Sequence, residues 1–267
     1  MVSNPLHKNN VTVAGKRDGS SATIVFAHGF GTDQTAWAKV YPAFSDNYRV
    51  ILYDNVGAGR AEMAAYSPNK YDNLSTYADD LLDICDELDV KDAVMVGHSV
   101  SGMISLLASV KEPERFNKMV LIGSTARYLN DVGYIGGFDQ ETLDSFYQAM
   151  SNNYYAWVSG FAPAAMANED KPELAESFAQ TLSAIRPDIA QAVARVIFQS
   201  DYRQALEKCT TETLLLQTRR DIAVPMEAAE YLHEHIKNSR LQVIDAEGHF
   251  PHISAPHEVV AAIKNFI

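Results

Sequence analysis

The stretch "DAVMVGHSVSGMISLLASV", residues 92–110, predicts a strand, a tight turn and a helix in immediate succession. Residues 92–96 form a short apolar run typical of a strand buried on both faces, and residues 103–110 carry apolar side chains at helical spacing. Between them, Ser99 lies in a Gly-x-Ser-x turn that matches the start of the G-x-S-x-G elbow, where a serine is exposed between a strand and a helix. We therefore expect Ser99 to be a nucleophile at the edge of a sheet.

The fifth position of the elbow pattern departs from glycine. Ser101 occupies it, and the glycine follows one residue later at Gly102. Serine adds only a hydroxymethyl group, so we expect the turn to tolerate Ser101 after a modest backbone adjustment. Because a match of this quality occurs by chance in many proteins, its interpretation depends on the residues elsewhere in the chain.

Short β-branched or apolar runs recur along the chain and alternate with helix-like stretches. The runs begin near residues 9, 22, 48, 92, 118, 213 and 241, and from the second onward they lack clean polar alternation. Helical spacing of apolar residues covers 76–88, 99–110, 226–236 and the stretch from 256 to the end. This order predicts the α/β class, with a mainly parallel sheet flanked by helices on both faces.

The alternation breaks between about residues 139 and 201, where four helix-like stretches follow one another without a strand. Pro172 and Pro187 suit the first turns of two of these helices, and Pro163 predicts a break within or after the second. We therefore expect a core of residues 1–138 and 202–267, with residues 139–201 inserted as a helical cap over the strand ends, where open sheets bind ligands.

Composition excludes several functions. The chain has 267 residues, with 22 Lys and Arg against 34 Asp and Glu, so its formal charge is −12. This charge, together with the absence of a basic run, argues against nucleic-acid binding. There is no membrane-length apolar run and no apolar signal segment, so we expect a soluble, cytoplasmic protein with no membrane partner. Cys85 and Cys209 lack metal-ligand spacing and are expected to be reduced and buried. The glycine-bearing run 54–60 lacks the spacing of a phosphate loop, and we expect no cofactor and no metal.

An activated serine needs a base, and the base needs an acid that orients it. Asp221 follows the predicted strand that begins near residue 213, and His249 follows the strand that begins near residue 241. The order Ser99, Asp221, His249 is that of the serine-elbow hydrolases, and all three lie at the sheet edge where parallel strands end. We expect these three residues to form the catalytic triad.

Each partner has an alternative. His252 is close enough in sequence to rival His249 as the base, although His249 directly follows a glycine after the strand. Asp221 could instead pair with Arg219 or Arg220 at a helix start, which would be its ordinary role outside this context. The joint order and spacing favour the catalytic assignment.

An oxyanion hole requires two backbone N–H groups, one after the nucleophile and one from an early loop. Val100 provides the first. The run His28-Gly29-Phe30-Gly31 follows a predicted strand, so the N–H of Phe30 is the candidate for the second. Alone, this run is equally compatible with a simple glycine-bearing loop.

These motifs jointly resemble one subfamily of the α/β-hydrolases, that of bacterial RsbQ-type stress regulators and the plant karrikin and strigolactone receptors. The resemblance covers nearly the whole chain and is carried by "HGFGTDQTAW", "DNVGAGR", "GHSVSGM", "ARYLND", "RPDIA", "RRDIAVP" and "EGHFPHISAP". It implies that Ser101 is a signature of the elbow and that a four-helix cap covers an apolar pocket. The pocket positions it implies are Phe30, Tyr128, Trp157, Phe161, Phe178, Phe198 and Ile222. The cap aromatics are also compatible with a purely structural role between helices.

Two hypotheses of function follow. The first is a serine hydrolase of small, mostly apolar esters or enol-lactones of the butenolide type, acting through an acyl-enzyme. The second is a small-molecule sensor whose slow hydrolysis signals to a protein partner. A catalytically inactive scaffold is disfavoured because the triad, elbow and oxyanion loop are all present.

Overall fold

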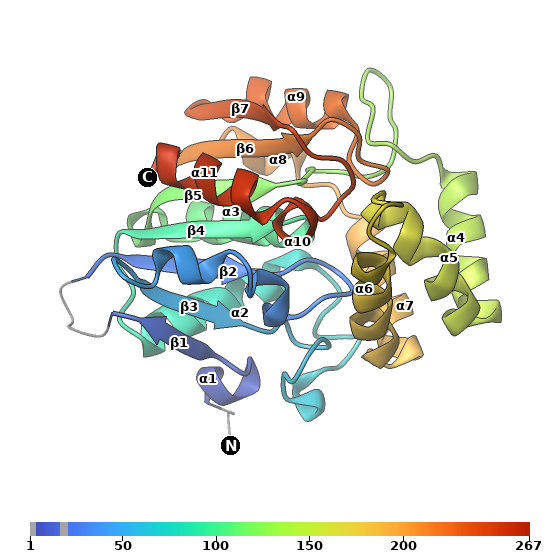
Figure 1. Ribbon diagram of the computed structural model, residues 1–267, viewed down its shortest axis with the longest axis horizontal. Coiled ribbons are helices and arrows are strands. Elements are labelled where there is room, and N and C mark those ends of the chain that lie inside the picture. The colour runs from blue at the N-terminus through green and yellow to red at the C-terminus, as the bar shows by residue number, and fades with distance from the viewer. Residues whose placement is uncertain (1–3, 17–20) are drawn as a thin grey trace.

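Seven strands form one sheet in the order β1-β3-β2-β4-β5-β6-β7 in the computed structural model, which describes residues 4–16 and 21–267 (Figure 1). All neighbouring strands are parallel except β1 and β3, which are antiparallel. The strands are β1 Thr12–Gly15, β2 Thr23–Ala27, β3 Arg49–Tyr53, β4 Ala93–His98, β5 Phe116–Ile122, β6 Glu212–Thr218 and β7 Ser239–Ile244. The predicted α/β class with a mainly parallel sheet is confirmed.

The central strands are buried on both faces, as their uniformly apolar sequences predict. Every residue of β2 and β4 is buried, whereas the edge strands β1 and β7 consist mostly of exposed and partly buried positions. Side chains of opposite parity enter two separate cores, one on each face of the sheet. Burial on both sides fixes the register of the central strands and so fixes where each of them ends.

Helices cover both faces. The larger core packs against α2 Leu74–Glu87, α3 Val100–Lys111, α8 Arg203–Leu206 and α9 Met226–His235. The second core packs against η1 Gln34–Trp37, η2 Tyr41–Phe44 and α11 Pro256–Phe266, with α10 Pro251–Ser254 just before α11. The remaining short helices are α1 Pro5–Lys8, η3 Met63–Ala65 and η4 Pro113–Arg115. Across residues 4–16 and 21–267, no helix is both long and apolar enough to cross a membrane.

Of the helices that follow β5 and precede β6 in sequence, the first four lie beside the end of the sheet where β4 passes into α3 (Figure 1). They are α4 Gln140–Asn152, α5 Tyr154–Met166, α6 Pro172–Ala184 and α7 Pro187–Phe198, here called the four-helix segment. Pro172 and Pro187 occupy first turns, as predicted.

Pro163 lies near the end of α5, which agrees with the predicted break within or after this helix. The helix continues to Met166 and ends at Ala167, which has a left-handed φ of 50°. The N–H of Ala167 donates to the carbonyl of Pro163 at 2.9 Å, so the last turn is held by a bond that does not need the missing proline N–H.

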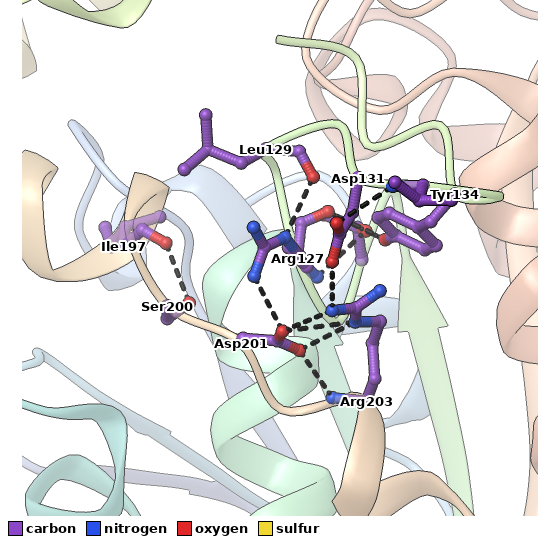
Figure 2. A network of polar contacts seen from close by, with 10 residues as sticks. Arg127, Leu129, Asp131, Tyr134, Ile197, Ser200, Asp201 and Arg203 are labelled. Carbon is purple, nitrogen blue, oxygen red and sulfur yellow. Dashed lines mark hydrogen bonds and ion pairs between the residues drawn. The ribbon is translucent and has the colours of Figure 1, made fainter. Parts of the chain in front are cut away.

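The two connections of the four-helix segment to the rest of the chain lie side by side. Arg127 and Asp201 form an antiparallel bridge, and the Arg127 Nη1 lies 2.7 Å from the Asp201 carboxylate. Arg203 lies 2.6 Å from Asp201 and 2.8 Å from Asp131, which joins the network from the first connection (Figure 2). The guanidinium of Arg203 also lies over the ring of Tyr134. This network holds together the two connections of the four-helix segment.

Candidate active site

The turn between β4 and α3 holds Ser99 in an unusual backbone conformation. Its φ of 55° and ψ of −123° are rare for a residue with a Cβ atom. A Cβ atom on Gly97 would lie 2.5 Å from the carbonyl oxygen of Ser101, so the turn closes only around a glycine there. Such conformations are concentrated at functional sites, and this one sets Ser99 at the start of the helix.

Ser101 has a partner that the sequence did not reveal. Its Oγ donates to the carbonyl of His28 at 2.5 Å and accepts a hydrogen bond from the amide of Asn55 at 3.1 Å. His28 belongs to the loop that also carries Phe30. The hydroxyl therefore ties the elbow helix to this loop, which goes beyond the simple steric tolerance that was expected.

Gly102 is required by a neighbouring strand end. A Cβ atom at this position would lie 2.0 Å from the Oγ of Ser124, just after β5. The hydroxyl of Ser124 donates to the carbonyl of Ser99 at 2.9 Å. Gly102 thus leaves room for the side chain of Ser124, which bonds the backbone carbonyl of Ser99.

The structure brings the three predicted catalytic residues together. The Ser99 Oγ lies 2.8 Å from the Nε2 of His249, and the Nδ1 of His249 lies 2.8 Å from the Oδ2 of Asp221. The other carboxylate oxygen of Asp221 accepts the N–H groups of Ala223 and Val224 at 2.8 and 3.1 Å. The side chains of His249 and Asp221 are only 8% and 1% exposed, so water does not compete for these bonds. With a neutral His249, Nδ1–H donates to Asp221 and Nε2 accepts the hydroxyl proton of Ser99.

The alternative partner of Asp221 is not observed. Arg219 lies 3.1 Å from Asp245, and Arg220 lies 2.9 Å from Glu247, so each arginine has a different exposed carboxylate. Neither arginine therefore competes with His249 for the carboxylate of Asp221.

The rival base, His252, is buried away from the nucleophile. Its ring packs between those of Trp37, at 4.4 Å, and His98, at 4.3 Å, with the ring planes tilted in both contacts. Burial lowers the pKa of His252 to about 3, so the ring stays neutral. Only His249 contacts the Ser99 hydroxyl among the histidines in the described ranges.

His98 holds the loop of His249, a contact that no sequence signal indicated beyond the place of His98 beside Ser99. Its Nε2 lies 2.7 Å from the carbonyl oxygen of His249 and donates to it. Burial, with smaller contributions from His252 and His249, holds the pKa of His98 well below its usual range. With its proton on Nε2, the neutral ring of His98 can hold the loop of His249 without placing a positive charge next to the ring of His249.

The two predicted oxyanion donors come from adjoining elements. Val100 is the first residue of α3, so its N–H has no partner within the helix and lies at the positive end of the helix dipole. Phe30 follows Gly29, where a Cβ atom would lie 2.4 Å from the Nδ1 of His98 and 3.2 Å from the Cβ of Ser99. The early loop therefore packs directly against the elbow.

Phe30 and Val100 line one cavity of about 30 Å³. Its surroundings are almost entirely apolar, and the other lining residues include Leu74, Tyr77, Ile104, Ile185, Val193 and Ile197. By this measure a water molecule needs roughly 10–15 Å³, so the cavity accepts only a group of a few heavy atoms. A larger ligand needs side chains or helices to shift.

Tyr128 is the predicted pocket residue that reaches the nucleophile. Its hydroxyl lies 3.2 Å from the Oγ of Ser99, and the ring of Phe198 packs against it at 4.8 Å. Burial raises the pKa of Tyr128, so the phenol stays protonated. Because the Ser99 proton is directed to His249, Tyr128 is the donor and Ser99 the acceptor in this contact.

The remaining predicted pocket residues divide into two groups. Trp157 and Phe161 stack on each other at 4.9 Å within the four-helix segment, and Phe178 packs on Phe250, next to His249, at 4.3 Å. None of these three belongs to the lining of the 30 Å³ cavity: Trp157 and Phe161 pack between helices, and Phe178 packs against loops of the core. Ile222 is 50% exposed, which corrects the implied place in an apolar lining: it follows Asp221 at the surface of the turn.

The fold model of the alpha/beta hydrolases matches residues 22–256. Together with the sheet order and the geometry around Ser99, this match shows that the chain belongs to the α/β-hydrolase family. It is similar in structure to a hydrolase from Oleispira antarctica, with a TM-score of 0.94 and 31% identity, covering 98% of this chain and 96% of that one.

Sequence similarity to known proteins identifies the subfamily to which the chain belongs. The chain is 42% identical over 262 residues to the strigolactone esterase D14 of Arabidopsis thaliana, covering 98% of this chain and 97% of the relative. It is 40% identical over 260 residues to the karrikin insensitive 2 receptor CA of Petunia hybrida, covering 97% and 95%. Within the family, the chain falls in the subfamily of the strigolactone and karrikin receptors, and it is a hydrolase of the esterase kind.

Proposed function

We propose that this chain hydrolyses small, mostly apolar esters or enol-lactones, with Ser99 as nucleophile, His249 as base and Asp221 as the orienting acid. The observation that carries the proposal is the buried line of hydrogen bonds from Asp221 through His249 to Ser99, with 2.8 Å at both steps. This arrangement matches the order of proton transfers that acyl transfer requires.

The reaction begins when the Oγ of Ser99 attacks the carbonyl carbon and His249 accepts the hydroxyl proton. The N–H groups of Phe30 and Val100 stabilise the oxyanion of the tetrahedral intermediate. His249 then gives its proton to the departing alcohol or enol oxygen, leaving an acyl ester on Ser99. Water attacks this ester by the same steps in reverse and regenerates the free serine.

We propose that residues 139–201 serve as a cap over a core formed by residues 1–138 and 202–267. Phe178 of α6 packs against Gly31 in the oxyanion loop, where an added Cβ atom would lie 2.9 Å from its ring. Thr181, also in α6, donates to the carbonyl of Gly31 at 2.9 Å. The apolar lining of the adjoining cavity supports a neutral, compact substrate.

A second candidate function is that of a small-molecule sensor which signals to a protein partner. It is supported by the relative named as a karrikin insensitive 2 receptor, with 40% identity over nearly the whole chain. Hydrolysis would then be slow and would mark the ligand-bound state. Both candidates use the same triad.

The test follows product release from a chromogenic short-chain ester and from a butenolide probe, with the intact mass of the protein recorded throughout. Replacing Ser99 by Ala removes the nucleophile, and we expect the rate to fall by at least about 10³-fold. The melting temperature of Ser99→Ala is measured beside it, so that loss of activity is separated from loss of fold.

The time course separates the two candidates. Sustained turnover without a lasting mass increase supports a metabolic esterase or lactonase. One burst followed by a stall, with added mass retained, supports a sensor. Undiminished hydrolysis by the folded Ser99→Ala protein would overturn the triad.

A further inference from the structure

The loop that carries His249 is held from two sides. On the core side, His98 donates from Nε2 to the carbonyl of His249 at 2.7 Å. On the other side, the N–H of His249 donates at 2.8 Å to the carbonyl of Ala165, in the last turn of α5. Both backbone polar groups of the base are thus used, one by the core and one by the four-helix segment.

The contact between this loop and α5 is close. Gly248 has a φ of 85°, and a Cβ atom there would lie 2.0 Å from the carbonyl oxygen of Met166. The N–H of Gly248 donates to the carbonyl of Arg220 at 2.8 Å, on the turn that also carries Asp221. The loop therefore lies between the end of α5 and the turn of the catalytic acid, without space for a side chain.

One side chain spans this contact. Asn168 follows the left-handed Ala167, and its Nδ2 lies 2.6 Å from the carbonyl oxygen of Met166. The same nitrogen lies 3.3 Å from the carbonyl oxygen of Glu247, two residues before the base. Asn168 therefore satisfies a carbonyl at the helix end that has no partner in the helix, and it joins that end to the loop of His249.

We propose that the C-terminal end of α5, residues 165–168, positions the catalytic base, with Asn168 as the positioning side chain. The proposal rests on the proposed function, since it takes His249 as the base. Asn168 touches no reacting atom and acts through the backbone of residues 247–249. Its effect is on where Nε2 of His249 lies relative to the Oγ of Ser99, a distance that proton transfer requires to be short.

The test compares Asn168→Ala and Asn168→Asp with Asn153→Ala. Asn153 caps the opposite end of the same helix, where its side chain accepts the N–H of Ala156 at 3.1 Å, far along α5 from the catalytic loop. Each variant weakens α5 at one end, so the melting temperatures should fall by similar amounts. Asn168→Asp keeps the shape of the side chain and replaces the donor by a carboxylate that faces two carbonyl oxygens.

We expect kcat on the chromogenic ester to fall about tenfold in Asn168→Ala, and at least as far in Asn168→Asp, because a displacement of the base below 1 Å is enough for such a loss. KM should change less than about twofold, since ligand contacts are untouched. Labelling of Ser99 by a fluorophosphonate should slow in parallel with kcat. Asn153→Ala should keep the wild-type kcat.

The proposal is overturned if both Asn168 variants fold and retain the wild-type kcat, or if Asn153→Ala loses as much activity as they do. Failure of the proposed function is a separate outcome: the wild-type protein would then show no hydrolysis that depends on Ser99. Asn168→Asp serves as the second variant in case Asn168→Ala does not fold.

Discussion

At the scale of single residues, Ser101 connects the two elements that carry the proposed oxyanion donors, Phe30 and Val100. Its hydroxyl bonds the carbonyl of His28 on one side and the amide of Asn55 on the other, while its backbone belongs to the helix that begins at Val100. Ser101 therefore provides a hydroxyl partner for the carbonyl of His28 and the amide of Asn55. A glycine at this position would leave each of these buried groups with one hydrogen bond fewer.

Replacing Ser101 by Ala should lower both stability and activity. The lost bonds leave buried polar groups short of a partner, so we expect the free energy of unfolding to fall by about 1–3 kcal/mol. The loop of Phe30 loses its tie to α3, and kcat should fall severalfold. Urea unfolding and ester kinetics measure the two effects.

Ser109→Ala is the matched control. Ser109 lies on the same helix and is buried, but its hydroxyl bonds the carbonyl of Leu106 within α3, at 2.8 Å, far from the oxyanion loop. It should lose some stability and keep its kcat. An unchanged kcat in Ser101→Ala would show that this hydroxyl does not hold the loop.

At the scale of elements, an ionic network joins the two connections between the four-helix segment and the rest of the chain, and no shared strand in the described part of the chain does so. Asp201 follows α7 and lies within reach of both Arg127 and Arg203 (Figure 2). Burial alone would raise the pKa of Asp201, but the hydrogen bonds from Arg203 and Arg127 outweigh it and lower the pKa to about 2.

A depressed carboxyl pKa contributes stability above the pKa of the unfolded chain and loses it as the pH falls toward the folded value. For Asp201 this window runs from about pH 4 down to about pH 2. Since the side chain is 32% exposed, solvent screens the network, and we expect about 1 kcal/mol from it.

Asp201→Asn should therefore lower the free energy of unfolding near neutral pH, and its difference from the wild type should shrink as the pH falls through this window. Urea unfolding at about pH 6, 4 and 3 measures the difference. Asp188→Asn is the control, because Asp188 pairs with Arg186 on an exposed surface of the same segment. A difference that stays constant with pH would contradict the assignment to Asp201.

At the scale of the whole molecule, the N-terminal segment is joined to the core by a buried ion pair. The Nζ of Lys8 lies 2.7 Å from the carboxylate of Asp80 on α2, and the two side chains are 9% and 5% exposed. The hydroxyl of Tyr71 donates to the same carboxylate at 2.9 Å. Lys8 is the kind of residue that sequence alone assigns to the surface.

Lys8→Met should leave Asp80 buried without its cation and lower the free energy of unfolding by about 3–5 kcal/mol. Adding Asp80→Asn removes the uncompensated charge and should restore part of the loss. Thermal and urea unfolding of the single and double variants measure this. Lys91→Met, which breaks an exposed pair with Asp89, should cost less than about 1 kcal/mol. Equal losses from Lys8→Met and Lys91→Met would contradict the buried pair.

Local sequence patterns are enough to predict the strands, their alternation with helices and the residues at the strand ends. Runs that are apolar throughout must be buried on both faces, and in a parallel sheet the residues after β4, β6 and β7 must meet at one edge. This reasoning is local, because it needs only the period of the side chains and the order of the strands. It predicted that Ser99, Asp221 and His249 would meet.

The groups that hold these three residues together become visible only in the folded chain. The contacts of Ser101 with His28, of His98 with the carbonyl of His249 and of Asn168 with Glu247 join residues 73, 151 and 79 positions apart. All three end on a backbone carbonyl of a loop whose path depends on its neighbours, and the contact of Asn168 depends also on how α5 lies against the core. Residue type and spacing carry no signal for such bonds, because a carbonyl oxygen is present at every position of the chain.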